Sequence, residues 1–310
     1  MANARRWNKL AMLFGIEATY GTDKIPTVAD AIIGTNVSFT PIEGQEVSRD
    51  LMLPYLGNQG IVLAGMYGRV EFDVEIAGAG AAGTVPKYGS VLRTAGMRET
   101  ITAGEKVEYE IVEDGVESGS LYFVHDGVRH ILLGCQTNIA PSFTPSAIPR
   151  FRVTLLGLLG TITDVAVMPA VTMNGWTTPK HVSKANTIAT LHGWTAVAES
   201  VSLDLGNTLT PRMLIGDELI MISDRSSSGT AVVEARKLVT IDWFQRAQSR
   251  TRGVLSVIHG TTAGNIVEIT APAVEIGKPA TSQTNGITNY SLPLLLCPVA
   301  GMDEMKITVR

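Results

Sequence analysis

The 310-residue sequence is poor in cysteine, in charge and in aromatic side chains. It contains two cysteines, 6% aromatic residues and 17% charged residues, whereas an ordinary soluble domain carries about 25% charged residues. Cys135 and Cys297 cannot form a disulfide framework or a metal set, so we expect folding in a reducing cytoplasm. With 45% apolar residues the chain is too hydrophobic to be disordered. The shortage of charge suggests that partners cover part of its surface.

Long hydrophobic runs and basic blocks are missing too. The longest apolar stretch, residues 292–300, is interrupted by two prolines and falls short of the ~20 residues that span a bilayer. A net charge of −4 without a basic cluster argues against a dedicated nucleic-acid binder. Basic residues before the apolar run 10–16 loosely imitate a secretory signal, but that run stops at Glu17 and no small-residue cleavage site follows. The sequence therefore predicts neither membrane insertion nor a signal peptide.

The dominant pattern is that of short β-strands. Residues 70–76 alternate strictly between apolar side chains and carboxylates, which predicts a strand with one wet face. Asp126-Gly127 between two apolar runs predicts a β-hairpin. Further strands are expected at 36–40, 106–112, 150–156, 200–205, 218–222, 231–235, 253–258, 265–269 and 291–296. Their spacing predicts a sandwich or barrel.

Two helices and an internal repeat complete the predicted organisation. Residues 88–95 and 241–251 contain helix formers and are followed by Gly96 and Gly253 as stop signals. The order strand, long loop, strand, helix, hairpin, closing strand occurs once in each half of the chain, which predicts a duplicated domain. The expected divisions are an N-terminal arm (1–35), a first domain (36–160), a linker (161–198) and a second domain (199–310).

Motifs for catalysis and cofactor binding are absent or unconvincing. The segment 78–83 matches G-x-G-x-x-G, but the strand before it is acidic and Pro86 precedes the helix, so we expect a flexible Gly/Ala loop. His125 and His130 flank the hairpin turn, and two ligands do not make a zinc site. No G-x-S-x-G, P-loop or HExxH motif occurs. The sequence predicts no enzyme, no cofactor and no metal.

The acidic strand face allows two interpretations. Three carboxylates at alternate positions repel one another if nothing compensates them, and the corresponding strand of the second half keeps one carboxylate. The face is either an ordinary solvated surface or the lining of a water-filled channel in which negative charge keeps DNA from sticking. The candidate lumen-facing residues are Glu71, Asp73, Glu75 and Glu234.

Several stretches of the sequence resemble a known family. These are LFGIEATYGTD (13–23), ADAII (29–33), SLDLGN (202–207), HGTTAGN (259–265) and GMDEM (301–305). Together and in this order they are similar to the major tail tube proteins of long-tailed (siphovirus-type) bacteriophages. The resemblance covers nearly the whole chain.

The resemblance implies a mainly β fold with minor helix, made of two tandem tail-tube-type β-sandwich or barrel domains, each with one flanking helix. It implies rings that stack into a tube, here three copies per ring with pseudo-sixfold symmetry because the domain is duplicated. The tape-measure protein and then DNA pass through the lumen, and terminator and tail-tip proteins bind the ends. The protein would assemble in the host cytoplasm and reside in the virion.

The resemblance also places contacts between rings in the N-terminal arm and in the long loop after the first strand. The candidate arm residues are Phe14, Glu17, Tyr20 and Asp23, and the candidate ring-stacking loop residues are Glu43, Glu46, Arg49, Asp50 and Tyr55. Residues 206–229 are the corresponding loop of the second half. Two alternatives stay open, namely a tail terminator or neck protein that does not polymerise and a β-rich receptor-binding module.

Overall fold

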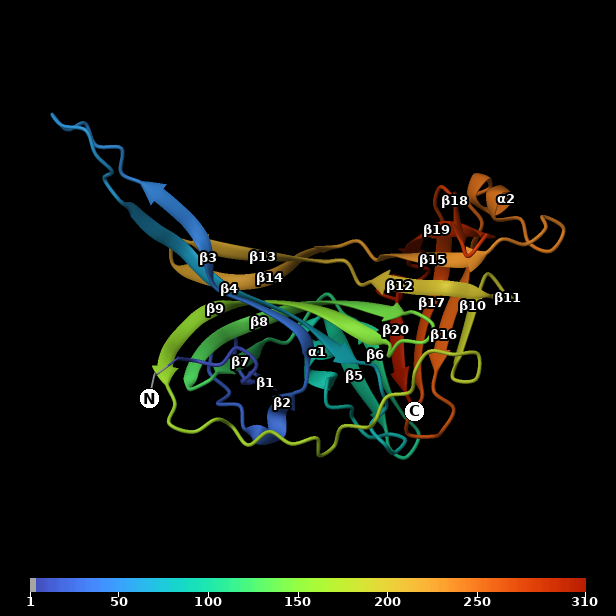
Figure 1. The fold of residues 1–310 in the computed structure, drawn as a ribbon, viewed down its shortest axis with the longest axis horizontal. Coiled ribbons are helices and arrows are strands. Elements are labelled where there is room, and N and C mark those ends of the chain that lie inside the picture. Colours follow the sequence, from blue (N-terminus) through green and yellow to red (C-terminus); the bar gives the residue numbers. More distant parts are fainter. Residues whose placement is uncertain (1–3) are drawn as a thin grey trace.

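The computed structural model describes residues 4–310 and consists mainly of antiparallel β-strands (Figure 1). The first half contains β1 (Leu10–Ile16), the 3₁₀ helix η1 (Val28–Asp30), β2 (Ala31–Ile32), β3 (Thr35–Ser48), β4 (Ile61–Glu75), α1 (Gly89–Thr94), β5 (Met97–Thr102), β6 (Lys106–Ile111), β7 (Gly119–His125), β8 (Val128–Phe143) and β9 (Arg150–Asp164). The second half contains β10 (Thr187–Leu191), β11 (Trp194–Thr195), β12 (Ala198–Asp204), β13 (Asn207–Leu214), β14 (Asp217–Arg225), β15 (Ser228–Glu234), α2 (Trp243–Gln248), β16 (Arg252–His259), β17 (Val267–Ile276), β18 (Ala280–Thr284), β19 (Ile287–Cys297) and β20 (Lys306–Val309). The prediction of a mainly β fold with minor helix is confirmed.

Local sequence explains the two strongest strand predictions. In β4 the apolar side chains of Val70, Phe72 and Val74 are buried, while the carboxylates between them stay partly exposed. The turn between β7 and β8 consists of Asp126 at φ +38° and Gly127 at φ +90°, so both central residues have positive φ, as a two-residue hairpin with right-handed twist requires. Both helices lie within the predicted ranges, and the Asp242 carboxylate caps α2 by accepting the Gln245 N–H at 2.8 Å.

The strands of the first half pair in the order β2–β1–β7–β8–β9–β4–β3. The second half pairs β11–β10–β16–β17 and β12–β15–β19–β18, with β17 also pairing β19. Buried apolar side chains from both halves form one continuous cluster, which includes Phe72, Tyr109, Phe151 and Trp243. The core therefore extends across the middle of the chain.

Sheets run from one half into the other at two joints. At the first joint, the end of β8 pairs antiparallel with β12, placing Ser142 opposite Ser202 and Phe143 opposite Val201. At the second joint, β6 pairs with β20, the last strand of the chain. The two halves thus join by strand pairing as well as by side-chain packing.

A loop contact between the halves explains the glycines of the segment 78–83. The Gly78 N–H donates to the Asn265 side chain at 2.8 Å, and the Gly80 N–H donates to the Gly264 carbonyl at 2.8 Å. A Cβ atom on Gly78 would lie 2.2 Å from that Gly264 oxygen. The glycines therefore serve close approach of two backbones, and the expectation of a flexible loop is corrected, because this loop is packed against the second half.

Each half also contains a long hairpin that extends beyond its sheet. In the second half β12 continues into β13 and β14 continues into β15, and the outer part, β13–β14, contacts β8 and β9 of the first half. In the first half the outer part of β3–β4 projects away from the body of the molecule (Figure 1). The two hairpins thus differ in what they contact.

Candidate assembly surfaces

The predicted N-terminal arm contains a strand of the protein's own sheet. Residues 1–3 of the arm lie outside the described residues, but β1 pairs with β7 along its whole length and with β2. Phe14 in this strand is only 2% exposed and belongs to the core. The structure therefore differs from the predicted division into a separate arm (1–35) and a first domain, because residues 10–16 form a strand of the sheet that contains β7 and β8.

Glu17 follows β1 and is held by four hydrogen bonds. One carboxylate oxygen accepts from the Gly21 N–H (2.8 Å) and the Ser118 hydroxyl (2.6 Å), and the other accepts from the Ser120 hydroxyl (2.8 Å) and the Gly134 N–H (2.9 Å). The side chain is 8% exposed, so the carboxylate is satisfied by these donors in place of water. Glu17 thus ties the segment after β1 to the start of β7 and the middle of β8.

Tyr20 and Asp23 also make contacts within the chain. The Tyr20 hydroxyl accepts from the Ile220 N–H at 2.6 Å and donates to the Ile220 carbonyl at 3.2 Å, which fixes β14 to the first half. Burial raises the pKa of Tyr20 to about 12, so the hydroxyl keeps its proton at neutral pH. The Asp23 carboxylate accepts from the Tyr122 hydroxyl at 2.6 Å. All four candidate arm residues therefore contact their own chain.

Replacing Tyr20 by phenylalanine should loosen β14 from the first half without unfolding the protein. The substitution removes two hydrogen bonds to one residue, each contributing about 0.5–1.5 kcal/mol. We expect amide hydrogen exchange at Ile220 to become roughly tenfold faster, because its N–H loses the Tyr20 hydroxyl as acceptor and opens locally. Tyr55→Phe, which alters an exposed tyrosine on the other hairpin, is the control. Unchanged exchange at Ile220 in the Tyr20 variant would show that side-chain packing alone holds β14.

The acidic face of β4 carries a cation that sequence reasoning missed. The Arg152 guanidinium on β9 bonds the Glu71 carboxylate at 2.6 Å and the Asp73 carboxylate at 3.1 Å, and Arg69 also pairs with Glu71. The Asn36 side chain donates to Asp73 at 2.6 Å. The hydrogen bond from Arg152 lowers the pKa of Glu71. These ion pairs compensate the repulsion that the sequence predicted among the carboxylates. The sequence did contain a signal for them, namely the arginines at alternate positions 150 and 152, which lie on the adjacent strand.

The other two candidate lumen residues also lie near arginines. Glu75 stands opposite Arg150 in the β4–β9 ladder, and Glu234 pairs with Arg236 at 3.3 Å. The strand register places further small polar side chains on the same face, because residues directly opposite one another point to one side of a sheet. These are Asn138 and Ser142 on β8, Thr154 on β9, Ser202 on β12 and Thr230 on β15. The face that spans both halves is therefore mainly polar and mixed in charge, with Val232 and Pro293 as apolar members.

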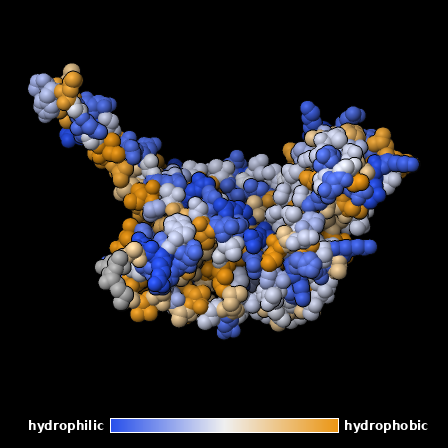
Figure 2. Space-filling view, viewed as in Figure 1, coloured by the Kyte–Doolittle hydropathy of each residue, from blue (hydrophilic) through white to orange (hydrophobic). Residues whose placement is uncertain are grey.

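The candidate ring-stacking residues lie on the projecting part of the β3–β4 hairpin or in its loop. Many of their neighbours are apolar and exposed, and Figure 2 shows hydrophobic side chains along this projection. The set comprises Ile42, Val47, Leu51, Met52, Leu53, Tyr55, Leu56, Ile61, Val62, Leu63 and Met66. Met52 and Leu56 are fully exposed. So many apolar side chains on one hairpin mark an interaction site.

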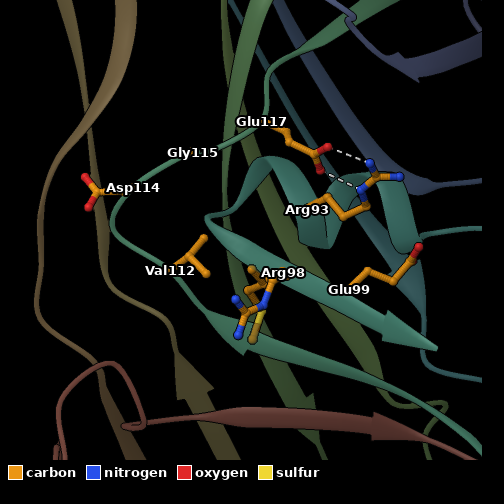
Figure 3. A pocket seen from close by; sticks show the side chains of 8 residues that line it. Arg93, Arg98, Glu99, Val112, Asp114, Gly115 and Glu117 are labelled. Atoms are coloured by element: carbon orange, nitrogen blue, oxygen red, sulfur yellow. Dashed lines mark hydrogen bonds and ion pairs between the residues drawn. The ribbon is translucent and has the colours of Figure 1, made fainter. Parts of the chain in front are cut away.

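A hollow beside α1 gathers charged residues that are engaged with one another (Figure 3). Arg93 and Glu117 point toward each other and form two parallel hydrogen bonds of 2.6 Å each, which raise the pKa of Arg93. Glu99 accepts from the buried Tyr109 hydroxyl at 2.7 Å. The Arg93–Glu117 pair holds α1 against the segment before β7, and the Glu99–Tyr109 bond joins β5 to β6, so both contacts have a structural role.

Two further findings concern metals and membranes. Within residues 4–310, no group of three or more histidine, cysteine, aspartate or glutamate side chains could hold a metal ion. Over the same range, no helix has both the length and the hydrophobicity needed to cross a bilayer.

The projecting hairpin with its exposed apolar side chains marks a surface that can associate with other chains. The family model for phage tail tube proteins matches residues 7–294, and the chain belongs to this family. No curated protein matches the chain. Membership confirms the resemblance to phage tail tube proteins and makes the protein a structural component of a phage virion.

Proposed function

We propose that the protein polymerises as stacked rings of three copies that form the tail tube and its channel. The observation that carries this proposal is the joint between β8 and β12, where the sheet of the first half continues into that of the second. A joint of this kind can be repeated between chains, because it uses main-chain groups at a strand edge. Head-to-tail repetition closes into a ring when the rotation per step divides a full turn.

Three copies per ring follow from the internal repeat. In each half a strand pair of the same kind precedes a short helix, and a long hairpin leaves the sheet at the same point. If each half is one tube domain, three chains supply six domains in each layer. The predicted boundaries, with domains at 36–160 and 199–310, belong to this proposal, although the structure makes residues 10–16 part of the first domain's sheet.

The polar face that contains Glu71, Asp73, Glu75 and Glu234 would line the channel. Serine, threonine and asparagine side chains together with paired charges offer DNA neither a cationic patch nor an apolar surface to stick to. In this arrangement the tape-measure protein occupies the lumen, terminator and tail-tip proteins bind the ends, and DNA passes without specific contacts. Assembly would take place in the host cytoplasm, and the protein would have no enzymatic role.

Electron microscopy of the purified protein at high concentration, with mass from light scattering, tests this function. We expect tubes or rings with six density lobes per layer and a ring mass about three times the 33.0 kDa of one chain. Six chains per layer would keep the tube but contradict the duplicated domain. A monomer that stays dispersed even with a tail-tip nucleus would favour a terminator or a receptor-binding module instead.

A further inference from the structure

Among the strands that pair on one side only in the described part of the molecule, β3 and β18 are the outermost strands of the sheets that contain β4–β9 and β15–β19. β3 pairs only with β4, and β18 pairs only with β19. Ser38 on β3 and Ser282 on β18 are both exposed. An open edge with unpaired N–H and carbonyl groups is a template for another strand.

Comparison of the strand pairing in the two halves shows which strand at the joint within the chain corresponds to each open edge. We align Phe72–Val153, the middle one of three β4–β9 pairs in which both apolar side chains are buried, with Ala231–Leu292, the β15–β19 pair in which both are buried. From there the register can be counted outward in both directions. β3 then corresponds to β12, and β18 corresponds to the end of β8.

The count reaches single residues. Ser38 stands opposite Glu71 and Ser202 stands opposite Thr230, one position before the aligned pair in each case. On the other side, Ser142 stands opposite Arg150 and Ser282 opposite Asn289, three positions before the aligned β9 and β19 residues. Ser38 is therefore the counterpart of Ser202, and Ser282 is the counterpart of Ser142.

Apolar side chains are less buried on the open edge of β3 than at the corresponding positions of β12, as expected if β3 lacks a neighbouring strand. At the joint within the chain, Val201 and Leu203 of β12 are 4% and 2% exposed. Their counterparts on β3, Val37 and Phe39, are only partly buried although they pack against the core. The open edge thus carries apolar side chains that a second sheet would cover.

The β13–β14 and β3–β4 hairpins also differ in how far their apolar side chains are buried. The β13–β14 hairpin lies on the first half of its own chain, where Ile220 is 1% exposed. The β3–β4 hairpin leaves the sheet at the corresponding point and carries the exposed apolar side chains of its projecting part. By the same register, a chain whose β18 meets β3 would present its second half to this hairpin.

We propose, building on the proposed ring, that β18 of one copy pairs antiparallel with β3 of the next copy in the register that places Ser282 opposite Ser38. The β3–β4 hairpin then lies across the second half of the neighbouring copy, as β13–β14 lies across the first half of its own chain. One neighbour accounts for both the open edge and the exposed apolar hairpin. The partner is a second copy of this chain.

Disulfide trapping tests the register. Directly opposite residues in an antiparallel pair have Cα atoms about 4.5–5.5 Å apart, which is within disulfide reach. In a Cys297→Ser background, the variant Ser38→Cys with Ser282→Cys should form intermolecular disulfides under mild oxidation once rings assemble. Covalent products on a non-reducing gel should end at the trimer, because a closed ring of three has no free end.

Matched variants calibrate the trapping. Ser142→Cys with Ser202→Cys, the equivalent pair at the joint within the chain, should form an intramolecular disulfide at a similar rate. Thr40→Cys with Ser282→Cys is two residues out of register and should cross-link at least tenfold more slowly. Each single cysteine variant should give no products beyond a dimer.

The outcomes separate the register from the function. Rings or tubes that assemble without the Ser38–Ser282 cross-link, or with faster cross-linking of Thr40, would overturn the proposed joint and leave the tube function standing. Failure of the unsubstituted protein to form rings would overturn the function and the joint together. A covalent ladder that continues beyond the trimer would contradict closure by three copies.

Discussion

Replacing residues 47–62 by an Asn-Gly turn should leave a folded chain that no longer forms tubes. Glu46 and Leu63 stand directly opposite each other in the β3–β4 ladder, so a two-residue turn can connect them without strain. The replacement removes eight of the exposed apolar side chains of the projecting hairpin, including Met52 and Leu56. It leaves the base of the hairpin, Thr35–Glu46 with its partner residues, in place.

The expected effect is large because each large apolar side chain that becomes buried contributes about 1.5–3 kcal/mol. Loss of two such contacts alone lowers the association constant by at least a hundredfold, since about 1.4 kcal/mol corresponds to a factor of ten. The concentration needed for rings, measured by sedimentation or light scattering, should rise by that factor or more. The thermal unfolding temperature of the monomer should stay within about 2 °C, because the removed side chains are exposed in the single chain.

A milder variant guards against a misfolded hairpin. Met52→Ser with Leu56→Ser keeps the backbone and removes two apolar side chains, so it should weaken assembly in the same direction by about a hundredfold. Asn58→Ser, which changes an exposed polar residue of the same loop outside the candidate ring-stacking set, is the control and should assemble normally. Tubes of normal length from the shortened chain would show that the hairpin is dispensable, and the docking proposed for it would be wrong.

Replacing Glu17 by alanine should destabilise the chain by about 3 kcal/mol or more. The substitution removes the carboxylate that accepts from the N–H groups of Gly21 and Gly134 and from the hydroxyls of Ser118 and Ser120. Each buried donor without an acceptor costs about 1–3 kcal/mol. The unfolding temperature should fall by roughly 6–12 °C, at about 2–4 °C per kcal/mol for a chain of this size class.

The matched control is Glu105→Ala, at an exposed turn between β5 and β6, for which we expect a change within about 0.5 kcal/mol. The stability loss of Glu17→Gln should lie between those of the two alanine variants. The amide keeps one acceptor oxygen, but its NH₂ group is itself a donor and faces the N–H and O–H donors that surround Glu17. Chemical denaturation of the monomer measures all three. If Glu17→Ala were as stable as the control, the four hydrogen bonds would have no net value, and the segment 17–23 would be held by other contacts.

The local elements of this fold could be predicted because they follow from periodicity and turn chemistry. The alternation in 70–76 and the Asp126-Gly127 turn each depend on a few neighbouring residues, and the structure confirms both. The same holds for the two helices. The joints between halves could not be predicted in this way, since β8–β12 and β6–β20 pairing involves residues far apart in the chain, and edge pairing carries no side-chain code.

Among the candidate site residues, too, some could be identified from local sequence and others only from tertiary contacts. Composition and alternation identified Glu71, Asp73 and Glu75 as one face of a strand, but not Arg152, which reaches that face from β9. The segment 13–23 was singled out by its resemblance to tail tube proteins, and its chemical role came from tertiary contacts. Phe14 enters the core, Glu17 collects four donors and Tyr20 holds β14.

By itself the sequence determined the fold class, the places of the helices and the absence of a membrane-length apolar run, since these depend on local pattern and composition. It also indicated the tail tube family, through the resemblance of several stretches to that family. The tertiary structure decided which hairpin is covered and which is exposed. The outer parts of β3–β4 and of β13–β14 are both hairpins, and their sequences do not say that one lies on the chain's own first half while the other projects from it. That difference depends on which strand edges the chain satisfies internally, and this is fixed only when distant strands pair.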